Sequence, residues 1–269
     1  MGITYFAGID IGSTCSKTVV MDESSRILHR LLRPTGWSSV DTAKTIRKEL
    51  EELGIAADCI QVVSTGYGRA SVSYASKNVT EITCHARGAC HIYGTKDLTV
   101  IDIGGQDTKL IVVQNGQVTD FLMNDKCSAG TGRFLEVMAN TLSVRLEELC
   151  ELAQRGGGVS ISSMCTVFAE SEVIGLIGKG EKRENIAYAV VNSIVQKVAS
   201  QAGRLKLDQT VCLTGGLCEF EYLRKRLGET LRCEVTACPD GRFAGAAGAA
   251  LRALKACKNA QIKEQHDIS

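Results

Sequence analysis

Two segments of the sequence repeat a pattern of residues that can bind phosphate groups and a metal ion. At an offset of 92 positions (101 minus 9), five residue types recur: Ile9, Asp10, Ile11, Gly12 and Lys17 match Ile101, Asp102, Ile103, Gly104 and Lys109. A glycine turn between two strands exposes backbone N–H groups to phosphate oxygens, the Lys adds positive charge, and the Asp suits Mg²⁺. One copy alone would be an ordinary hairpin turn, but two copies in register predict turns that clamp a polyphosphate.

The two turns supply the candidate residues for nucleotide binding and hydrolysis. In the first turn we predict phosphate contacts from Gly12, Ser13, Thr14, Cys15, Ser16 and Lys17. In the second turn we predict contacts from Gly104 and Gly105. The candidates for holding Mg²⁺ or the hydrolytic water are Asp10, Asp102 and Asp107, and Gln106 is the candidate for orienting that water. The alternative for Gln106 and Asp107 is a capping role within the tight turn.

A third element is the apolar strand pattern Val211–Thr214, which Gly215 and Gly216 separate from a following helical pattern. Two glycines before a helix let a nucleotide approach the backbone at the helix N-terminus. The chain has no Gly-x-x-x-x-Gly-Lys-Ser/Thr sequence and no Gly-x-Gly-x-x-Gly after a strand, which argues against a P-loop or a dinucleotide fold. Two phosphate hairpins followed by strand-Gly-Gly resemble instead the superfamily of sugar kinases, heat-shock 70 proteins and actin.

Two of the twelve cysteines stand in loops that open helices. Cys127 lies in a glycine-bearing loop, and Cys165 follows serines and precedes a second helical segment. The partial positive charge of a helix N-terminus stabilises a thiolate and any anionic cluster that it binds. Two thiolates can hold half of an iron–sulfur cluster, with a symmetric dimer supplying the other half. Their spacing matches no local metal motif, so from the residues alone two buried structural cysteines are the simpler interpretation.

The other cysteines form no coherent ligand set. Cys84-His85 and Cys90-His91 invite a zinc interpretation, but their spacing is wider than usual and the four residues do not share one helix face. We therefore interpret them as core or helix-surface residues, and the cysteines around the Gly-Gly turn as packing residues.

Composition and charge narrow the class of protein. The length of 269 residues suggests two domains, and 31 Lys plus Arg against 30 Asp plus Glu leave a net charge of +1. Without a charge excess, a nucleic-acid partner or an electrostatic membrane anchor is not expected. No run of about 18 apolar residues and no signal-peptide pattern is present, so we expect a cytoplasmic protein with reduced thiols and no membrane partner.

The hydrophobic pattern alternates between strand and helix periods, which predicts the α/β class. Strand–turn–strand units are predicted over 3–22 and 99–113, each followed by a third strand, the second through a type I′ turn at Asn115-Gly116. Helices are predicted over 39–53, twice within 130–155, and over 184–206 and 240–257, with the residues from Lys258 frayed. The superfamily resemblance implies an actin-like ATPase fold: two duplicated ribonuclease-H-like halves, 1–95 plus 240–258 and 96–239, with a nucleotide cleft between them.

Five phrases together closely resemble one family: Gly8-Ile-Asp-Ile-Gly-Ser-Thr, Ser64-Thr-Gly-Tyr-Gly-Arg, Val100-Ile-Asp-Ile-Gly-Gly-Gln-Asp, Met123-Asn-Asp-Lys-Cys-Ser-Ala-Gly-Thr-Gly-Arg-Phe and Cys165-Thr-Val-Phe-Ala-Glu-Ser-Glu. The family is the activators (component A) of (R)-2-hydroxyacyl-CoA dehydratases, related to ATP-binding subunits of benzoyl-CoA reductase. The resemblance covers about residues 3 to 255 and implies a homodimer with one [4Fe–4S] cluster, held by Cys127 and Cys165 of both chains. The predicted nucleotide-binding set is completed by Gly130, Gly132, Glu219 and Arg242, although Arg242 departs from the polar contact expected there.

The resemblance implies an ATP-dependent one-electron donor in an anaerobic cytoplasm. Reduced ferredoxin or flavodoxin charges the cluster, and hydrolysis of Mg²⁺-ATP drives the electron to the dehydratase, which removes water from a 2-hydroxyacyl-CoA through a ketyl radical. One alternative is a small-molecule kinase of the same fold, which needs no redox cofactor. Another is a non-enzymatic, actin-like nucleotide switch. Neither alternative explains why both cysteines open helices in loops rich in Gly and Ser.

Overall fold

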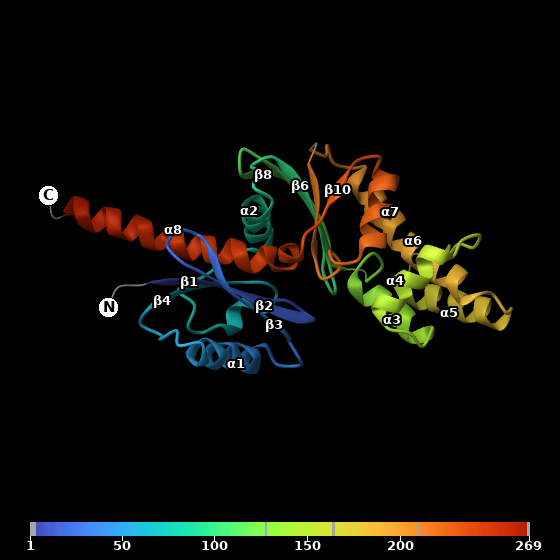
Figure 1. Ribbon diagram of the computed structural model, residues 1–269, viewed down its shortest axis with the longest axis horizontal. Coiled ribbons are helices and arrows are strands. Elements are labelled where there is room, and N and C mark those ends of the chain that lie inside the picture. The colour runs from blue at the N-terminus through green and yellow to red at the C-terminus, as the bar shows by residue number, and fades with distance from the viewer. Residues whose placement is uncertain (1–3, 127, 163–164, 209, 268–269) are drawn as a thin grey trace. The chain divides into compact units, whose positions relative to one another are not determined.

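The computed structural model describes residues 4–126, 128–162, 165–208 and 210–267. Contacts between residues divide it into two compact units. The first unit runs to Lys96, includes Gly116–Val118 and takes up the chain again from Phe243. The second unit comprises Asp97–Asn115 and Thr119–Arg242. Each unit is built on one five-stranded sheet, and Figure 1 labels most of the helices and strands.

The sheet of the first unit has the strand order β3-β2-β1-β4-β5. Its strands are β1 (Tyr5–Ile11), β2 (Cys15–Met21), β3 (Ile27–Pro34), β4 (Ile60–Thr65) and β5 (Lys77–Asn78). β1 pairs antiparallel with β2 and parallel with β4, which places both Lys17 and Thr65 opposite Asp10. The predicted strand–turn–strand unit over 3–22 is therefore confirmed.

Helices cover both faces of this sheet (Figure 1). They are α1 (Ser39–Glu52), α2 (Glu81–Tyr93) and α8 (Ala244–Asp267), with the short 3₁₀ turn η1 (Arg69–Ser71). A second 3₁₀ turn, η2 (Pro239–Phe243), contains the boundary between the two units in the sequence. Because side chains alternate along a strand, Ala7 and Ile9 of β1 pack in the core beneath α1, while Phe6 packs with α2 and α8. Asp10, four residues beyond Phe6, thus belongs to the face that α2 and α8 cover.

The predicted fraying of the C-terminus is wrong, because α8 continues to Asp267. No glycine or proline interrupts the sequence after Gly248 until that point. The residues from Lys258 are mostly good helix formers such as Ala, Gln, Lys and Glu, so a helix that starts in the core can propagate outward.

The second unit repeats the sheet of the first, in the strand order β10-β9-β6-β7-β8. Its strands are β6 (Leu98–Ile103), β7 (Thr108–Gln114), β8 (Gln117–Asn124), β9 (Val211–Gly215) and β10 (Val235–Thr236). β6 pairs antiparallel with β7 and parallel with β9, as β1 pairs with β2 and β4. Asn115 and Gly116 both have positive φ, at 51° and 72°, as the predicted type I′ turn requires.

The helices of the second unit share one large hydrophobic core with its sheet. They are α3 (Gly132–Thr141), α4 (Leu146–Arg155), α5 (Thr166–Gly178), α6 (Arg183–Ala202) and α7 (Glu221–Leu231). The helices predicted within 130–155 and over 184–206 are confirmed, and α6 ends at Ala202. Within the described ranges, no helix combines the length and hydropathy needed to cross a bilayer.

Candidate functional site

The first phosphate hairpin is the turn between β1 and β2. Ser13 is partly exposed and Thr14 is exposed, so the turn is open to a ligand. The Thr35 hydroxyl donates to the carbonyl oxygen of Gly12 at 2.7 Å, and Ser16 Oγ lies 2.8 Å from Thr35 Oγ1. Since Thr35 has a single hydroxyl proton, Ser16 is the donor in that pair. The turn is thus fixed from behind by two hydroxyl groups.

The Asp10 carboxylate lies buried at the end of β1, with 6% of its surface exposed. His85 of α2 approaches it, with Nε2 at 3.9 Å from Oδ2. Gly245, in the first turn of α8, also packs against the carboxylate, because a Cβ built on this glycine would lie only 2.5 Å from the same oxygen. The sequence patterns did not identify His85 or Gly245 as neighbours of Asp10, since both come from distant helices.

The second phosphate hairpin, between β6 and β7, is built around a buried ion-pair network. Lys109 is 3% exposed, and its Nζ lies 3.4 Å from Asp102 Oδ2 and 2.8 Å from Asp107 Oδ2. Thr214 of β9 donates to Asp102 Oδ1 at 2.7 Å. Asp107 also accepts at its carbonyl oxygen from the Gly104 N–H at 2.9 Å, and Gln106 is exposed. Asp107 therefore closes the turn and binds Lys109 at the same time.

The two lysines of the repeat differ in their surroundings. Lys109 bridges two carboxylates, so its charge is compensated within the second unit. Lys17 is partly exposed, and its Nζ contacts the carbonyl oxygen of Cys15 at 3.4 Å. The charge of Lys17 is not neutralised by a carbonyl oxygen, so it can still attract an anionic ligand. Lys109 lies between two carboxylates and chiefly orients them.

The sequence patterns did not identify a second duplicated feature: Thr65-Gly66 at the end of β4 matches Thr214-Gly215 at the end of β9. Gly66 and Gly215 have φ of +90° and +84°, a region that favours glycine. A Cβ on Gly66 would lie 2.4 Å from Asp10 Oδ1, and one on Gly215 would lie 3.1 Å from Asp102 Oδ1. Each glycine therefore lets a strand end pack directly against the carboxylate of a phosphate hairpin. The recurring Thr-Gly after an apolar strand is the signal that would have identified both.

The remaining predicted nucleotide residues of the second unit lie around the turn that follows β9. Gly216 has open space around it, with nothing within 4 Å of a Cβ built there. Arg242 Nη1 lies 2.9 Å from Glu219 Oε1, so these two side chains are joined by an ion pair. A charged pair beside an open glycine is suited to the polar edge of a ligand. The structure places these residues in one neighbourhood, and their contact with adenosine stays a prediction.

The segment that contains the first predicted cluster cysteine is hydrogen-bonded to the second cysteine segment. Cys165 is exposed and is the N-cap residue of α5, whereas Cys127 lies outside the described residues. Ser128 and Thr166, which directly follow the two cysteines, share a 2.7 Å hydrogen bond between their hydroxyl groups. The positive end of α5 suits an anionic group at Cys165. The exposed thiol of Cys165 at a helix N-terminus suits a thiolate ligand, and the iron–sulfur site itself stays a prediction.

The cysteine loop also contacts the second hairpin. Gly130 and Gly132, both buried, connect Cys127 to α3. Thr108 donates from its hydroxyl group to the Gly130 carbonyl oxygen at 2.6 Å, and the Gly132 N–H donates to the Gly104 carbonyl oxygen at 2.8 Å. Both glycines therefore bond to the hairpin itself, and their contribution to nucleotide binding stays a prediction.

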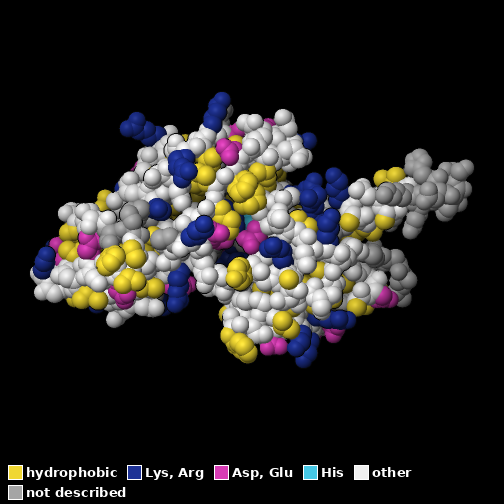
Figure 2. Space-filling model, turned by 180° about the vertical axis from the view of Figure 1, so that it is seen from behind, with side chains coloured by type: hydrophobic (Ala, Val, Ile, Leu, Met, Phe, Trp, Pro, Cys, Tyr) yellow, Lys and Arg dark blue, Asp and Glu magenta, His cyan; other side chains and the backbone are white. Residues whose placement is uncertain are grey.

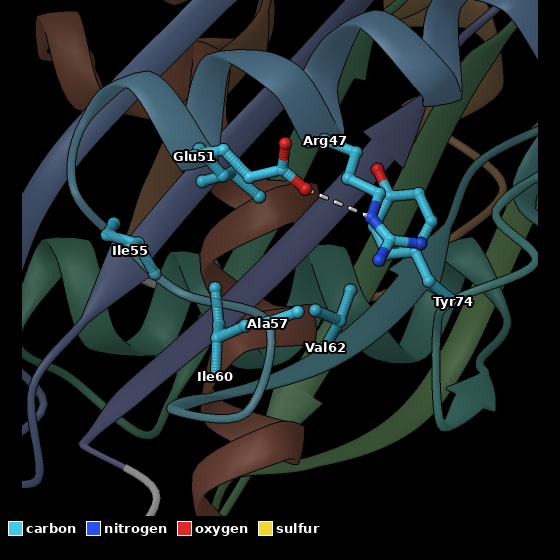
Figure 3. A pocket seen from close by; sticks show the side chains of 8 residues that line it. Arg47, Glu51, Ile55, Ala57, Ile60, Val62 and Tyr74 are labelled. Atoms are coloured by element: carbon cyan, nitrogen blue, oxygen red, sulfur yellow. Dashed lines mark hydrogen bonds and ion pairs between the residues drawn. The ribbon is translucent and has the colours of Figure 1, made fainter.

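A separate cavity of about 60 Å³ opens on the first unit beside α1 (Figure 3). It is lined by Arg47, Leu50, Glu51, Ile55, Ala57, Ile60, Val62 and Tyr74. Arg47 pairs with Glu51 at 3.3 Å and stacks 5.5 Å from the centre of the Tyr74 ring. The cavity lies toward the start of β4, while Asp10 faces the end of that strand. It is not part of the phosphate hairpin.

Comparison with known proteins identifies the family. The BadF/BadG/BcrA/BcrD ATPase family matches residues 7–253. The chain belongs to this family. The (R)-2-hydroxyglutaryl-CoA dehydratase activating ATPase of Acidaminococcus fermentans is 43% identical over 254 residues, which cover 93% of this chain and 97% of that protein. The family resemblance read from the sequence is confirmed.

Solved structures of related proteins confirm the fold class. The activator of 2-hydroxyisocaproyl-CoA dehydratase from Clostridium difficile, solved with bound ADPNP, superimposes with a TM-score of 0.89 at 38% identity, covering 96% of this chain and 97% of that one. A ROK family glucokinase from Streptomyces griseus shares the fold alone, with a TM-score of 0.58 at 15% identity. The chain is an ATPase with the actin-like fold of this family.

Proposed function

We propose that this ATPase is a homodimeric electron donor that activates a 2-hydroxyacyl-CoA dehydratase. Its relatives include proteins named as activators of 2-hydroxyglutaryl-CoA, lactoyl-CoA and 2-hydroxyisocaproyl-CoA dehydratases. Reduced ferredoxin or flavodoxin supplies one electron, and hydrolysis of ATP to ADP and phosphate accompanies its transfer to the dehydratase. The observation that carries the proposal is the hydrogen bond between Ser128 and Thr166, because it joins the segments that follow the two candidate ligands.

A [4Fe–4S] cluster, when bound, supplies a carrier for one electron and normally takes four thiolates. In this proposal Cys127 and Cys165 of each chain provide two, and a two-fold axis provides the other pair. The N-terminus of α5 stabilises the thiolate of Cys165 and the negative charge beside it. The serine and threonine hydroxyl groups that follow the cysteines hold the two segments in register.

The exposed face of α5 supports self-association next to Cys165. Val167 and Phe168 are each 66% exposed, and Ile174 is 57% exposed. Gly175 and Gly178 on the same helix have open space around them, so another helix can approach closely. Figure 2 shows hydrophobic side chains gathered on the part of the second unit that includes this helix, at the left of the view. Such a face is the surface that a second copy of the chain would bury.

The nucleotide is proposed to use both phosphate hairpins, one from each of the predicted domains 1–95 plus 240–258 and 96–239. Lys17 and the N–H groups of its turn bind phosphate oxygens, since no carboxylate of the described residues compensates the charge of Lys17. Asp102 and Asp107 hold Mg²⁺ or position the hydrolytic water, and Lys109 orients both carboxylates. Glu219 and Arg242 contact the adenosine.

Iron and acid-labile sulfide content of anaerobically purified protein tests the proposal, together with native mass. We expect about two irons per chain in a dimer, which corresponds to one bridging cluster. Cys165→Ser should lose the iron, whereas Cys59→Ser, a matched change of a thiol on the first unit, should retain it. Iron-free protein that still binds ATP after anaerobic handling would refute the proposal and favour a small-molecule kinase of the same fold.

A further inference from the structure

The N-terminus of α3 is capped by the second phosphate hairpin. The first N–H groups of a helix have no partner within the helix, and the N-cap residue of α3, Thr131, makes no side-chain capping bond. The partners come instead from the turn: the Gly132 N–H donates to the Gly104 carbonyl oxygen and the Arg133 N–H to the Gly105 carbonyl oxygen, both at 2.8 Å. Any rotation of these turn peptides therefore changes the cap of α3.

Thr108 adds a side-chain bond between the same two segments. It is the first residue of β7, it is 1% exposed, and its hydroxyl group donates to the Gly130 carbonyl oxygen at 2.6 Å. Gly130 is itself buried, and a Cβ there would lie 2.8 Å from Cγ of Lys197 on α6. The loop therefore packs against α6 at Gly130, and it cannot move away from the hairpin without breaking the bond between Thr108 and Gly130.

The cysteine loop is also closed on itself and linked to α5. The Thr131 hydroxyl group donates to the Ser128 carbonyl oxygen at 2.6 Å, and the Asn124 side-chain amide donates to the Ala129 carbonyl oxygen at 3.1 Å. Ser128 then bonds to Thr166 in the first turn of α5. These bonds form a continuous chain from the glycine turn of the hairpin to the residues that follow both cysteines.

The first unit shows what the equivalent position does without cysteines. Ser16 corresponds to Thr108 at the offset of 92 (108 minus 16) and bonds to Thr35, in the segment that follows the third strand of its sheet. That segment leads into α1, whose N-cap is the side chain of Ser38. The duplicated hydroxyl group thus anchors the segment after the third strand in both units. Among the described residues, the phosphate turn caps the following helix in the second unit, whereas the side chain of Ser38 caps it in the first.

We infer that Thr108 is a positioning residue that couples the nucleotide turn of hairpin 2 to the cysteine loop. This inference rests on the proposed function for its meaning, since the loop is the one proposed to hold a cluster ligand. Binding of a γ-phosphate at Gly104–Gly105 would reorient peptides that cap α3, and Thr108 would make the loop follow. The signal then reaches Thr166 through Ser128, within one unit.

Thr108→Val tests the inference because it removes the hydroxyl group at nearly constant volume. Thr18→Val is the matched control: Thr18 lies in β2, is 1% exposed, and its hydroxyl group has no hydrogen-bond partner among the described residues. Amide hydrogen exchange is compared with ADP and with a non-hydrolysable ATP analogue, in the full-length protein with and without iron. The peptide over 128–136 reports the loop, and the peptide over 12–20 reports nucleotide binding.

In the wild type and in Thr18→Val we expect the exchange of 128–136 to differ between the two nucleotides. In Thr108→Val this difference should be lost while the response of 12–20 and the iron content are retained. A difference of wild-type size in Thr108→Val, or none in the wild type, would overturn the inference. Wild-type protein that contains no iron after anaerobic purification would instead refute the proposed function. The exchange comparison would still show whether Thr108 couples the hairpin to the loop. If Thr108→Val does not fold, Ser128→Ala tests the last bond of the chain. The exchange of a peptide over α5, Thr166–Gly178, should then no longer differ between the two nucleotides while that of 128–136 still does, and a retained difference in α5 would count against the chain of bonds.

Discussion

Gly66 is a position where one added methyl group should distort the first phosphate hairpin. Its φ is +90°, and a Cβ would lie 2.4 Å from Asp10 Oδ1 and 2.5 Å from the carbonyl oxygen of Ile11. Gly54, after α1, is a matched control because its φ is +78° and nothing lies within 4 Å of a Cβ built there. Gly66→Ala and Gly54→Ala therefore share the backbone penalty but not the overlap.

The expected loss can be divided between these two causes. The left-handed backbone costs about 1–2 kcal/mol for alanine at either position. At Gly66 the overlap also requires Asp10 or the central strand β1 to shift, and overpacking of this kind costs about 1–3 kcal/mol more. In a protein of this size about 1 kcal/mol lowers the Tm by about 2–4 °C, so Gly66→Ala should melt about 2–12 °C below Gly54→Ala.

Thermal unfolding followed by far-UV circular dichroism measures that difference, and titration with Mg²⁺-ATP measures its functional consequence. Gly66→Ala should bind the nucleotide more weakly because the Asp10 carboxylate is displaced, whereas Gly54→Ala should bind as the wild type does. Equal melting temperatures for the two variants would refute the packing argument. A lower Tm with unchanged Mg²⁺-ATP affinity would refute the placement of Asp10 in the nucleotide site.

Two further predictions concern buried charges and thiols. Lys109→Met removes the cation shared by the buried Asp102 and the partly exposed Asp107 and should lower the free energy of unfolding in urea by about 3–5 kcal/mol, whereas Lys225→Met removes only an exposed pair with Glu221 and should cost under about 1 kcal/mol. Similar losses in the two variants would contradict the network. Burial raises the pKa of Cys84 to about 11 and that of Cys218 to about 12, so the folded state keeps these protons longer than the unfolded state. Their contribution to stability is complete below the ordinary thiol pKa of 9.0 and is lost as the pH rises from there through the folded-state pKa values of about 11 and about 12. The urea midpoint should therefore fall between pH 9.0 and about 12, and it should fall less in Cys84→Ala.

The duplicated hairpins could be predicted from the sequence because their signal is local. Asp, Gly and Lys stand within eight residues of one another in each copy, and the strand alternation around them is strict. The N-cap position of Cys165 was predictable for the same reason, since a helical pattern begins directly after it. Local patterns of this kind specify both an element and the residues at its ends.

Residues that reach the site from distant elements could not be predicted in this way. His85 and Gly245 approach Asp10 only because α2 and α8 cover one face of the sheet. The contact of Thr214 with Asp102 joins residues 112 positions apart. No spacing rule in a single sequence encodes such pairs, because they follow from strand order and helix packing. The extension of α8 to Asp267 has the opposite cause: the polar composition from Lys258 onward predicts fraying, but the helix propensity of these residues prevails.

The duplication gave both units the same sheet and the same turn, yet it did not give them the same electrostatics. In the first hairpin Lys17 contacts the carbonyl oxygen of Cys15 and no carboxylate among the described residues, and Asp10 faces His85. In the second hairpin the lysine forms ion pairs with two carboxylates, and the carbonyl oxygens of the turn accept hydrogen bonds from the first N–H groups of α3. The lysine charge that can bind a phosphate group therefore lies in the first unit, and the hydrogen bonds to the cysteine loop lie in the second unit. An ATPase that couples hydrolysis to an event elsewhere needs a turn that binds phosphate and a turn that is bonded to the responding segment. Because the hairpin is duplicated, one copy can be selected for phosphate binding and the other for the connection to the loop.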